Sequence, residues 1–188
     1  MYEEIIYSFL VSIFFLLFII SGCKKENSSV NEDTIKEVLS ELLNLPNEKL
    51  FKSIQNYSDQ VVSGEVDNSK EPEYSSILEN MFHSQFTDEG YGKFINETAM
   101  YYVTTTQDAG FITKVKDVNV TQNKEDELRC TFTATINYTD NNNKSGTTKI
   151  SGNAEFKEKG KLTIFKITTN DLLEKMKKIA NEVKIPKE

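Results

Sequence analysis

The sequence contains one histidine, two cysteines and no tryptophan among its 188 residues. A single histidine, His83, excludes a histidine-rich metal site. No serine or cysteine nucleophile is identifiable beside it, so we expect a surface side chain rather than a general base. Basic residues are the minority charge, 22 against 29 acidic residues. This balance argues against nucleic acid as a partner, because proteins that bind it gather basic residues on one surface.

A long apolar run covers residues 5–20 and leads directly into Ser21-Gly22-Cys23. Small residues before the cysteine let an extended backbone enter a peptidase cleft, and the thiol can take a diacylglyceryl group. This ending resembles the lipobox of bacterial lipoprotein precursors. We therefore expect residues 1–22 to be a lipoprotein signal peptide. Lipidated, palmitate-bearing Cys23 would then anchor the chain to the cell membrane, facing outside the cytoplasm.

The charges around this run favour a second interpretation. Glu3 and Glu4 precede it without any lysine or arginine, whereas a signal peptide normally begins with positive charge. Lys24 and Lys25 follow it, and the positive-inside rule would then place the C-terminal part in the cytoplasm. Residues 5–22 just reach the length of about 17 to 25 residues that a spanning helix needs. The alternatives are therefore an uncleaved membrane anchor, or a start codon upstream that adds a basic segment.

After the apolar run, composition predicts a short tether and one folded domain. Residues 23–33 are polar and aperiodic, which is typical of a flexible segment that lifts a domain off the membrane. Residues 34–188 are long enough to bury one core, so we expect a single domain there. With Cys23 lipidated, Cys130 is the one thiol left in the sequence, and no intramolecular disulfide can form.

Apolar residues at spacings of three and four predict four helices. The first opens with a capping box of Thr34 and Glu37, and Asn47 can cap the second. A polar loop over residues 63–72 separates the second helix from the third. The predicted helices cover residues 34–45, 47–61, 74–86 and 171–183.

From residue 98 onward the apolar period changes from 3.6 to 2, which predicts strands. Just before this change, Gly90 and Gly92 predict a tight reversal. A slip of the apolar phase near Asp117 indicates a β-bulge. Cys130 falls on the apolar face of its strand, so we expect a buried, inert thiol. The predicted strands cover residues 100–106, 111–122, 128–138, 150–156 and 162–168.

This order of elements predicts an α+β fold in which N-terminal helices pack on a curved antiparallel β-meander and a C-terminal helix follows. Together with the run FTDEGY at residues 86–91, the order resembles nuclear transport factor 2-like domains of Firmicute lipoproteins of unassigned role. The resemblance would cover about residues 33–183, and it implies a cone-like sheet with a pocket at its open end. One departure is that such domains place a strand between the second and third helices, where only residues 61–66 could supply it. The terminal helix is also additional to the family pattern.

The sequence contains no recognisable catalytic, cofactor-binding or metal-binding motif. Tyr101, Tyr102, Asp117 and Tyr138 are candidates for a proton-transfer pocket, in which an aspartate base and a tyrosine hydroxyl act on a buried carbonyl. Packing in the core or on the sheet explains the same residues. Residues 140–143, Asp-Asn-Asn-Asn, lack the spaced acidic ligands of a calcium loop, so we interpret them as a hairpin turn.

The sequence therefore predicts a membrane-anchored extracytoplasmic lipoprotein that binds a protein partner or a small ligand and is not an enzyme. We expect the membrane as a partner through lipidated Cys23, and no cofactor, metal or nucleic acid. A component of an envelope assembly, such as a conjugation or secretion machine, is the alternative. A proton-transfer pocket enzyme is the third hypothesis.

Overall fold

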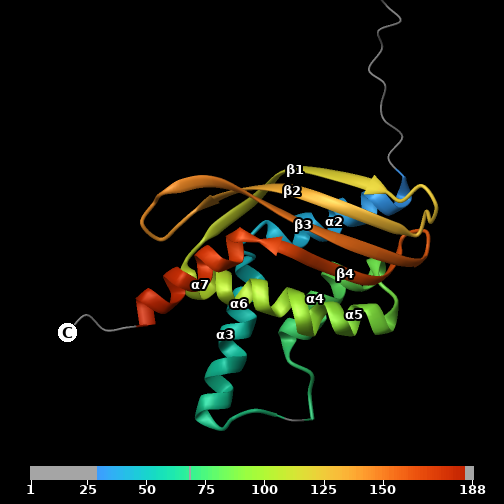
Figure 1. Ribbon diagram of the computed structural model, residues 1–188. Coiled ribbons are helices and arrows are strands. Elements are labelled where there is room, and N and C mark those ends of the chain that lie inside the picture. Colours follow the sequence, from blue (N-terminus) through green and yellow to red (C-terminus); the bar gives the residue numbers. More distant parts are fainter. Residues whose placement is uncertain (1–28, 68, 185–188) are drawn as a thin grey trace, which may run out of the picture.

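The computed structural model describes residues 29–67 and 69–184 (Figure 1). The predicted signal peptide, Cys23 and most of the predicted tether lie outside the described residues. Helices come first, a four-stranded antiparallel sheet follows, and one helix ends the order, so the predicted α+β class is confirmed. The helices are α2 (Val30–Leu43), α3 (Glu48–Ser63), α4 (Glu73–Phe82), α5 (Asp88–Phe94), α6 (Met100–Ala109) and α7 (Asp171–Lys184). A 3₁₀ turn, η1 (His83–Gln85), precedes α5, and a π-helix, η2 (Ile95–Ala99), joins α5 to α6.

The sheet is a meander of β1 (Ile112–Gln122), β2 (Arg129–Thr139), β3 (Ser145–Glu158) and β4 (Lys161–Asn170), in that spatial order. The predicted bulge is confirmed, because the β1–β2 register shifts between Val115 and Asp117. Side chains along β2 alternate between buried and exposed, which is typical of an antiparallel sheet with one solvated face. The sheet therefore has a single core-facing side and two edges, β1 and β4.

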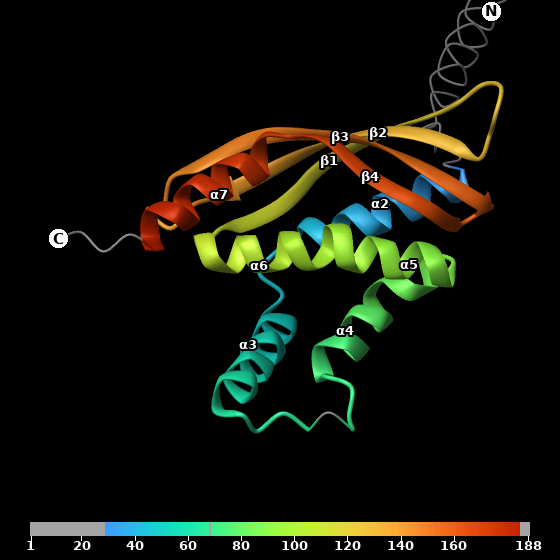
Figure 2. The ribbon, with the colours of Figure 1, turned by 60° about the horizontal axis from the view of Figure 1, so that its bottom comes forward.

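The sheet arches over a layer formed by α2, α5 and α6, while α3 and α4 project away from it (Figure 2). Apolar side chains from the inner sheet face and from these helices form one core. Its largest fully buried members include Phe82, Phe86, Leu39, Ile136 and Leu162. Within residues 29–67 and 69–184, none of the helices combines the length and hydropathy that crossing a bilayer requires.

The first helix begins earlier than predicted, so residues 30–33 belong to a helix and not to a tether. Ser29 is the actual N-cap, and its hydroxyl accepts a hydrogen bond from the Glu32 backbone N–H. Thr34, the predicted cap, instead donates its hydroxyl to the Val30 carbonyl one turn back. Asn31 is buried and bonds to Glu127 and to the Gly160 N–H, so tertiary contacts extend the helix through a polar stretch. By contrast, the predicted Asn47 cap of α3 is confirmed.

Residues 100–106 form helix α6, so the predicted strand there is wrong. The stretch is rich in aromatic and β-branched residues, which favour strands when sequence alone is considered. Its buried residues are Tyr102, Val103, Thr106 and Ala109, which is helical spacing. Thr106 also donates its hydroxyl to the Tyr102 carbonyl, so the side chain's polar group is satisfied within the helix.

Gly90 and Gly92 lie inside α5 and do not form the predicted reversal. Thr87 caps this helix by accepting a hydrogen bond from the Gly90 N–H, so the FTDEGY run leads into a helix. Gly90 is needed for close packing, because a Cβ there would lie 2.6 Å from the Leu162 carbonyl oxygen. The same oxygen accepts a hydrogen bond from the Thr87 N–H at 2.9 Å, which docks α5 against β4.

The segment between α3 and α4 contains no strand among its described residues. Helix α3 continues to Ser63, and Gly64 ends it in the left-handed conformation at φ 73°. The departure from the nuclear transport factor 2-like pattern that the sequence indicated is therefore present in the structure.

Candidate functional site

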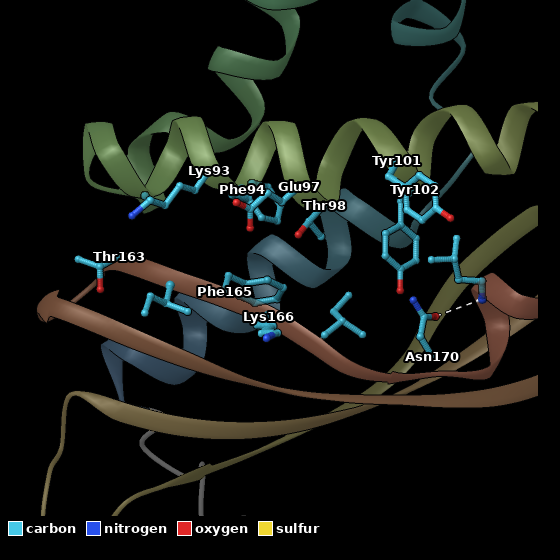
Figure 3. Close-up of a pocket in the computed structure, with 14 residues that line it drawn as sticks. Lys93, Phe94, Glu97, Thr98, Tyr101, Tyr102, Thr163, Phe165, Lys166 and Asn170 are labelled. Carbon is cyan, nitrogen blue, oxygen red and sulfur yellow. Dashed lines mark hydrogen bonds between the residues drawn. The ribbon is translucent and has the colours of Figure 1, made fainter.

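A cavity of about 520 Å³ lies between β4 and the helical run from α5 to α6 (Figure 3). We call it the β4 cavity. Its volume falls within the range of about 300 to 1,000 Å³ that is typical of ligand pockets. One wall comes from β4 and the start of α7, and the other from α5, η2 and α6. Its inner lining includes Phe94, Thr98, Tyr102, Phe165 and Asn170, and the exposed Tyr101 lies at its rim.

The β4 cavity follows the edge of the strand rather than one face of the sheet. Side chains on one strand alternate between the two faces, so a cavity over a single face is lined by every second residue. Here five consecutive residues, Thr163–Ile167, line the cavity. The backbone of β4 therefore forms part of the wall.

An aromatic cluster forms the inner wall of the cavity. The Phe94 ring stacks on Phe86 with centroids 4.6 Å apart, and it meets Phe82 at 5.1 Å and Phe165 at 5.6 Å, edge to face. Phe165 in turn stacks on Phe132 of β2 at 4.9 Å. These contacts fix the wall in one arrangement, because rings that interdigitate at such distances leave little room for rotamer change.

Tyr102 supplies the one buried side-chain hydroxyl among the described residues of this wall that has no hydrogen-bond partner. The side chain is only 2% exposed, and it points from α6 toward the end of β4. Burial raises the pKa of this hydroxyl far above its ordinary value of 10.0, so it remains protonated at neutral pH. The Asn170 amide lies beside it and partly opposes the pKa shift, but the two groups do not reach hydrogen-bond geometry. A buried donor without a partner is costly, so this hydroxyl is an exception to the usual pairing of buried polar groups.

The charges of the cavity lie at its rim. Lys93, Glu97 and Lys166 are all exposed. Lys93 bonds to Glu89 at 2.6 Å along the helix surface, and this contact lowers the pKa of Glu89 and raises that of Lys93. The inner surface is therefore mostly apolar, with Tyr102 as its fully buried hydroxyl, and the charged groups lie at the rim.

The structure does not bring the four predicted proton-transfer residues together. Tyr101 and Tyr102 line the β4 cavity. Asp117 is exposed on β1, the opposite edge of the sheet. Tyr138 stacks on Phe111, and its hydroxyl accepts a hydrogen bond from Lys175 at 3.2 Å. No aspartate from this set faces the buried Tyr102 hydroxyl, so the proposed base and acid are separated.

The remaining candidates occupy the places that the sequence predicted. His83 is a surface side chain, with Nε2 3.2 Å from an Asp88 carboxylate oxygen. Cys130 is a free, buried thiol, and burial raises its pKa, which disfavours the reactive thiolate. Asp140 closes the β2–β3 hairpin by accepting from the backbone N–H groups of Asn142 and Lys144. In the described part of the chain, no group of three or more His, Cys, Asp or Glu side chains is placed to hold a metal ion.

Sequence reasoning missed Asn170 and the role of β4 as a cavity wall. A signal was present in the sequence: Ile164 and Phe165 are adjacent and both apolar, which breaks the alternation of a strand with one solvated face. Ile164 is 43% exposed, whereas Phe165 is buried. The adjacent pair therefore indicates that β4 carries apolar side chains on both faces of the sheet.

No protein-family model matches this chain, and no curated protein or solved structure matches it either. The resemblance to nuclear transport factor 2-like domains thus stays a prediction that rests on element order and on FTDEGY. In the structure this short run docks α5 on β4, and its Gly90 is one of the residues that line the cavity.

Proposed function

We propose that this chain is an extracytoplasmic lipoprotein, anchored to the cell membrane through Cys23, whose domain binds a partner molecule in the β4 cavity without catalysing a reaction. The apolar run before Cys23 supports the anchor. The polar residues that follow Cys23 leave room between the membrane and the domain that begins at Ser29.

The unpartnered Tyr102 hydroxyl in a largely apolar cavity is the observation that carries the binding proposal. Binding sites commonly combine an apolar lining with a few placed polar groups that fix the orientation of a ligand. A carbonyl or ether oxygen of the bound molecule would accept from Tyr102 and satisfy a donor that the protein leaves unpaired. The ligand class is thus an apolar molecule or segment with one buried acceptor.

The absence of catalysis is part of this proposal. The charged residues that line the cavity, Lys93, Glu97 and Lys166, are exposed and stand at its rim. The lining residues, which are all described, include no serine, cysteine, histidine or aspartate, the residues that most often supply a nucleophile and its base. Turnover of any substrate above background in a broad hydrolase and isomerase screen would contradict this part.

Replacing Tyr102 with phenylalanine is expected to weaken ligand binding by about tenfold or more, because the acceptor of the ligand would then be buried without a donor. The probe is a library of small apolar carbonyl compounds, with hits measured by calorimetry on the full-length chain in detergent. Folding should be unchanged or slightly more stable, since the removed hydroxyl has no partner.

Tyr101→Phe is the matched control, because Tyr101 lies at the exposed rim, where its ring faces Lys177 at 5.2 Å. We expect this variant to bind as the parent does. If both variants lost the same ligand affinity, or if only Tyr101→Phe lost affinity, the ligand would lie outside the inner end of the cavity.

The anchor is tested by mass spectrometry of the N-terminus after membrane extraction. A peptide that begins at Cys23 and carries lipid is expected. A free Met1 would contradict the lipoprotein proposal and favour an uncleaved anchor.

A further inference from the structure

The outer edge of β4 has unpaired backbone groups. The strand lies at the end of the sheet, and β3 is its neighbour on one side. On the other side, the described residues form a single backbone hydrogen bond, in which the Thr87 N–H donates to the Leu162 carbonyl. Beyond Leu162 the outward-facing N–H and C=O groups of β4 form no hydrogen bond with the backbone of another element among the described residues. An edge of this kind is a template for another strand.

Two bulges define the part of β4 that is regular. Thr163 and Thr168 have no Cα partner in β3, whereas Ile164 to Ile167 pair in unbroken register with it. Bulges at an edge limit where a further strand can pair. The regular segment coincides with the residues that line the β4 cavity. The unpaired edge and the cavity are thus the same place.

We propose that the β4 cavity takes an extended peptide segment of a partner protein, which pairs with Ile164–Ile167 as a fifth strand of the sheet. This rests on the proposed function of the cavity and specifies its ligand. Main-chain hydrogen bonds supply affinity in such strand addition, and pockets for alternate side chains supply specificity. The aromatic wall around Phe94 receives the apolar side chains of the peptide, and the Tyr102 hydroxyl donates to one of its carbonyl groups.

Charge determines which partner fits. β4 carries Lys161 and Lys166 and has no acidic residue. Lys161 already donates to the Ser84 carbonyl, so Lys166 is the cation that faces an incoming strand at the cavity. A second copy paired through β4 would bring together two strands that each carry lysines and no carboxylate, and like charges are unfavourable for cross-strand neighbours. The occupant is therefore a segment that alternates apolar residues with others and carries an acidic residue opposite Lys166.

A random peptide library displayed on phage is the probe, panned against the immobilised full-length chain in detergent. Enriched peptides are synthesised and then methylated on one backbone nitrogen at a time. Strand addition predicts alternation: methylation at every second position weakens binding by about tenfold, because it removes a backbone donor, whereas the intervening positions tolerate it. Apolar docking without strand pairing shows no such period.

Two exposed isoleucines on opposite edge strands form a matched pair for this experiment. Ile164 lines the cavity and is 43% exposed, whereas Ile112 on β1 is 59% exposed. Ile164→Lys is expected to weaken peptide binding by about tenfold or more, and Ile112→Lys to leave it unchanged. Lys166→Glu changes only an exposed side chain, and we expect it to abolish binding of the acidic peptides. This variant provides a second test that does not depend on the folding of Ile164→Lys.

The outcomes separate this inference from the function on which it rests. Three results would overturn strand addition. The first is that the peptides tolerate methylation at every position, the second is that Ile164→Lys and Ile112→Lys lose the same peptide affinity, and the third is that the panning enriches no peptide. If small carbonyl compounds still bind in a manner that requires Tyr102, the cavity remains a binding site. If Tyr102→Phe binds both peptides and small carbonyl compounds as the parent does, both proposals fail. Pairing through β4 of a second copy, seen as a dimer that Ile164→Lys weakens and Ile112→Lys does not, would also overturn the peptide assignment.

Discussion

Replacing Phe94 with alanine is expected to lower the free energy of unfolding by about 3 to 5 kcal/mol. Phe94 is buried and contacts the rings of Phe82, Phe86 and Phe165. Truncation removes its buried apolar surface, and it enlarges a cavity that already adjoins the side chain, so the surroundings cannot close the space. Denaturation in urea, followed by far-ultraviolet circular dichroism, measures the change.

Tyr101→Ala provides the comparison, because this aromatic residue also lines the cavity but stands exposed at its rim. Its loss is expected to cost at most about 1 kcal/mol, mainly through the contact of its ring with Lys177. If the two variants lost the same stability, the aromatic wall would not be the part that holds α5 on the sheet.

Replacing Gly152 with alanine is expected to lower the free energy of unfolding by about 3 kcal/mol, the upper end of the usual cost of overpacking. Gly152 lies in the middle of β3, where its neighbours come unusually close. An added Cβ would overlap the Lys166 carbonyl oxygen and lie 2.5 Å from Cζ of Phe132. The carbonyl belongs to a paired strand, so it cannot move away without breaking the β3–β4 ladder. The same denaturation experiment tests this expectation.

Gly92→Ala is the control, because a Cβ at this position in α5 meets nothing within 4 Å. Alanine is the better helix former, so this change is expected to stabilise the protein by about 0.5 to 1 kcal/mol. A Gly152→Ala variant as stable as the parent would mean that the sheet does not hold β3 and β4 as closely as the structure indicates.

Local sequence patterns correctly predicted the strand that is buried on one face and solvated on the other. The alternation along β2 placed Cys130 in the core and predicted the solvated outer face, because a strand in a two-layer fold is buried on one side only. The slip of the apolar phase near Asp117 predicted the bulge, because an extra residue is needed to keep the apolar side chains of β1 on the buried face. The Asn47 cap followed from the hydrogen-bonding need of the first helical turn.

The failures occurred where tertiary contacts outweighed local preference. Residues 100–109 favour strand by composition, yet they continue the helix that Thr87 starts and bury Tyr102 and Thr106 at helical spacing. The two glycines of α5 indicate a turn when taken alone. Gly90 instead allows a helix to approach the backbone of β4, a contact 72 residues away along the chain that a local pattern cannot contain.

The candidate site shows the same division. The sequence by itself determined the apolar run before Cys23, the acidic balance, the α+β class and the inward face of the central strand, because each depends on composition or on a short period. Only the tertiary structure decided that β4 is an edge, that α6 faces it, and that the Tyr102 hydroxyl is buried between them without a partner. Whether a strand is an edge depends on which segments pair with it, and that is a property of the assembled chain rather than of any window of residues.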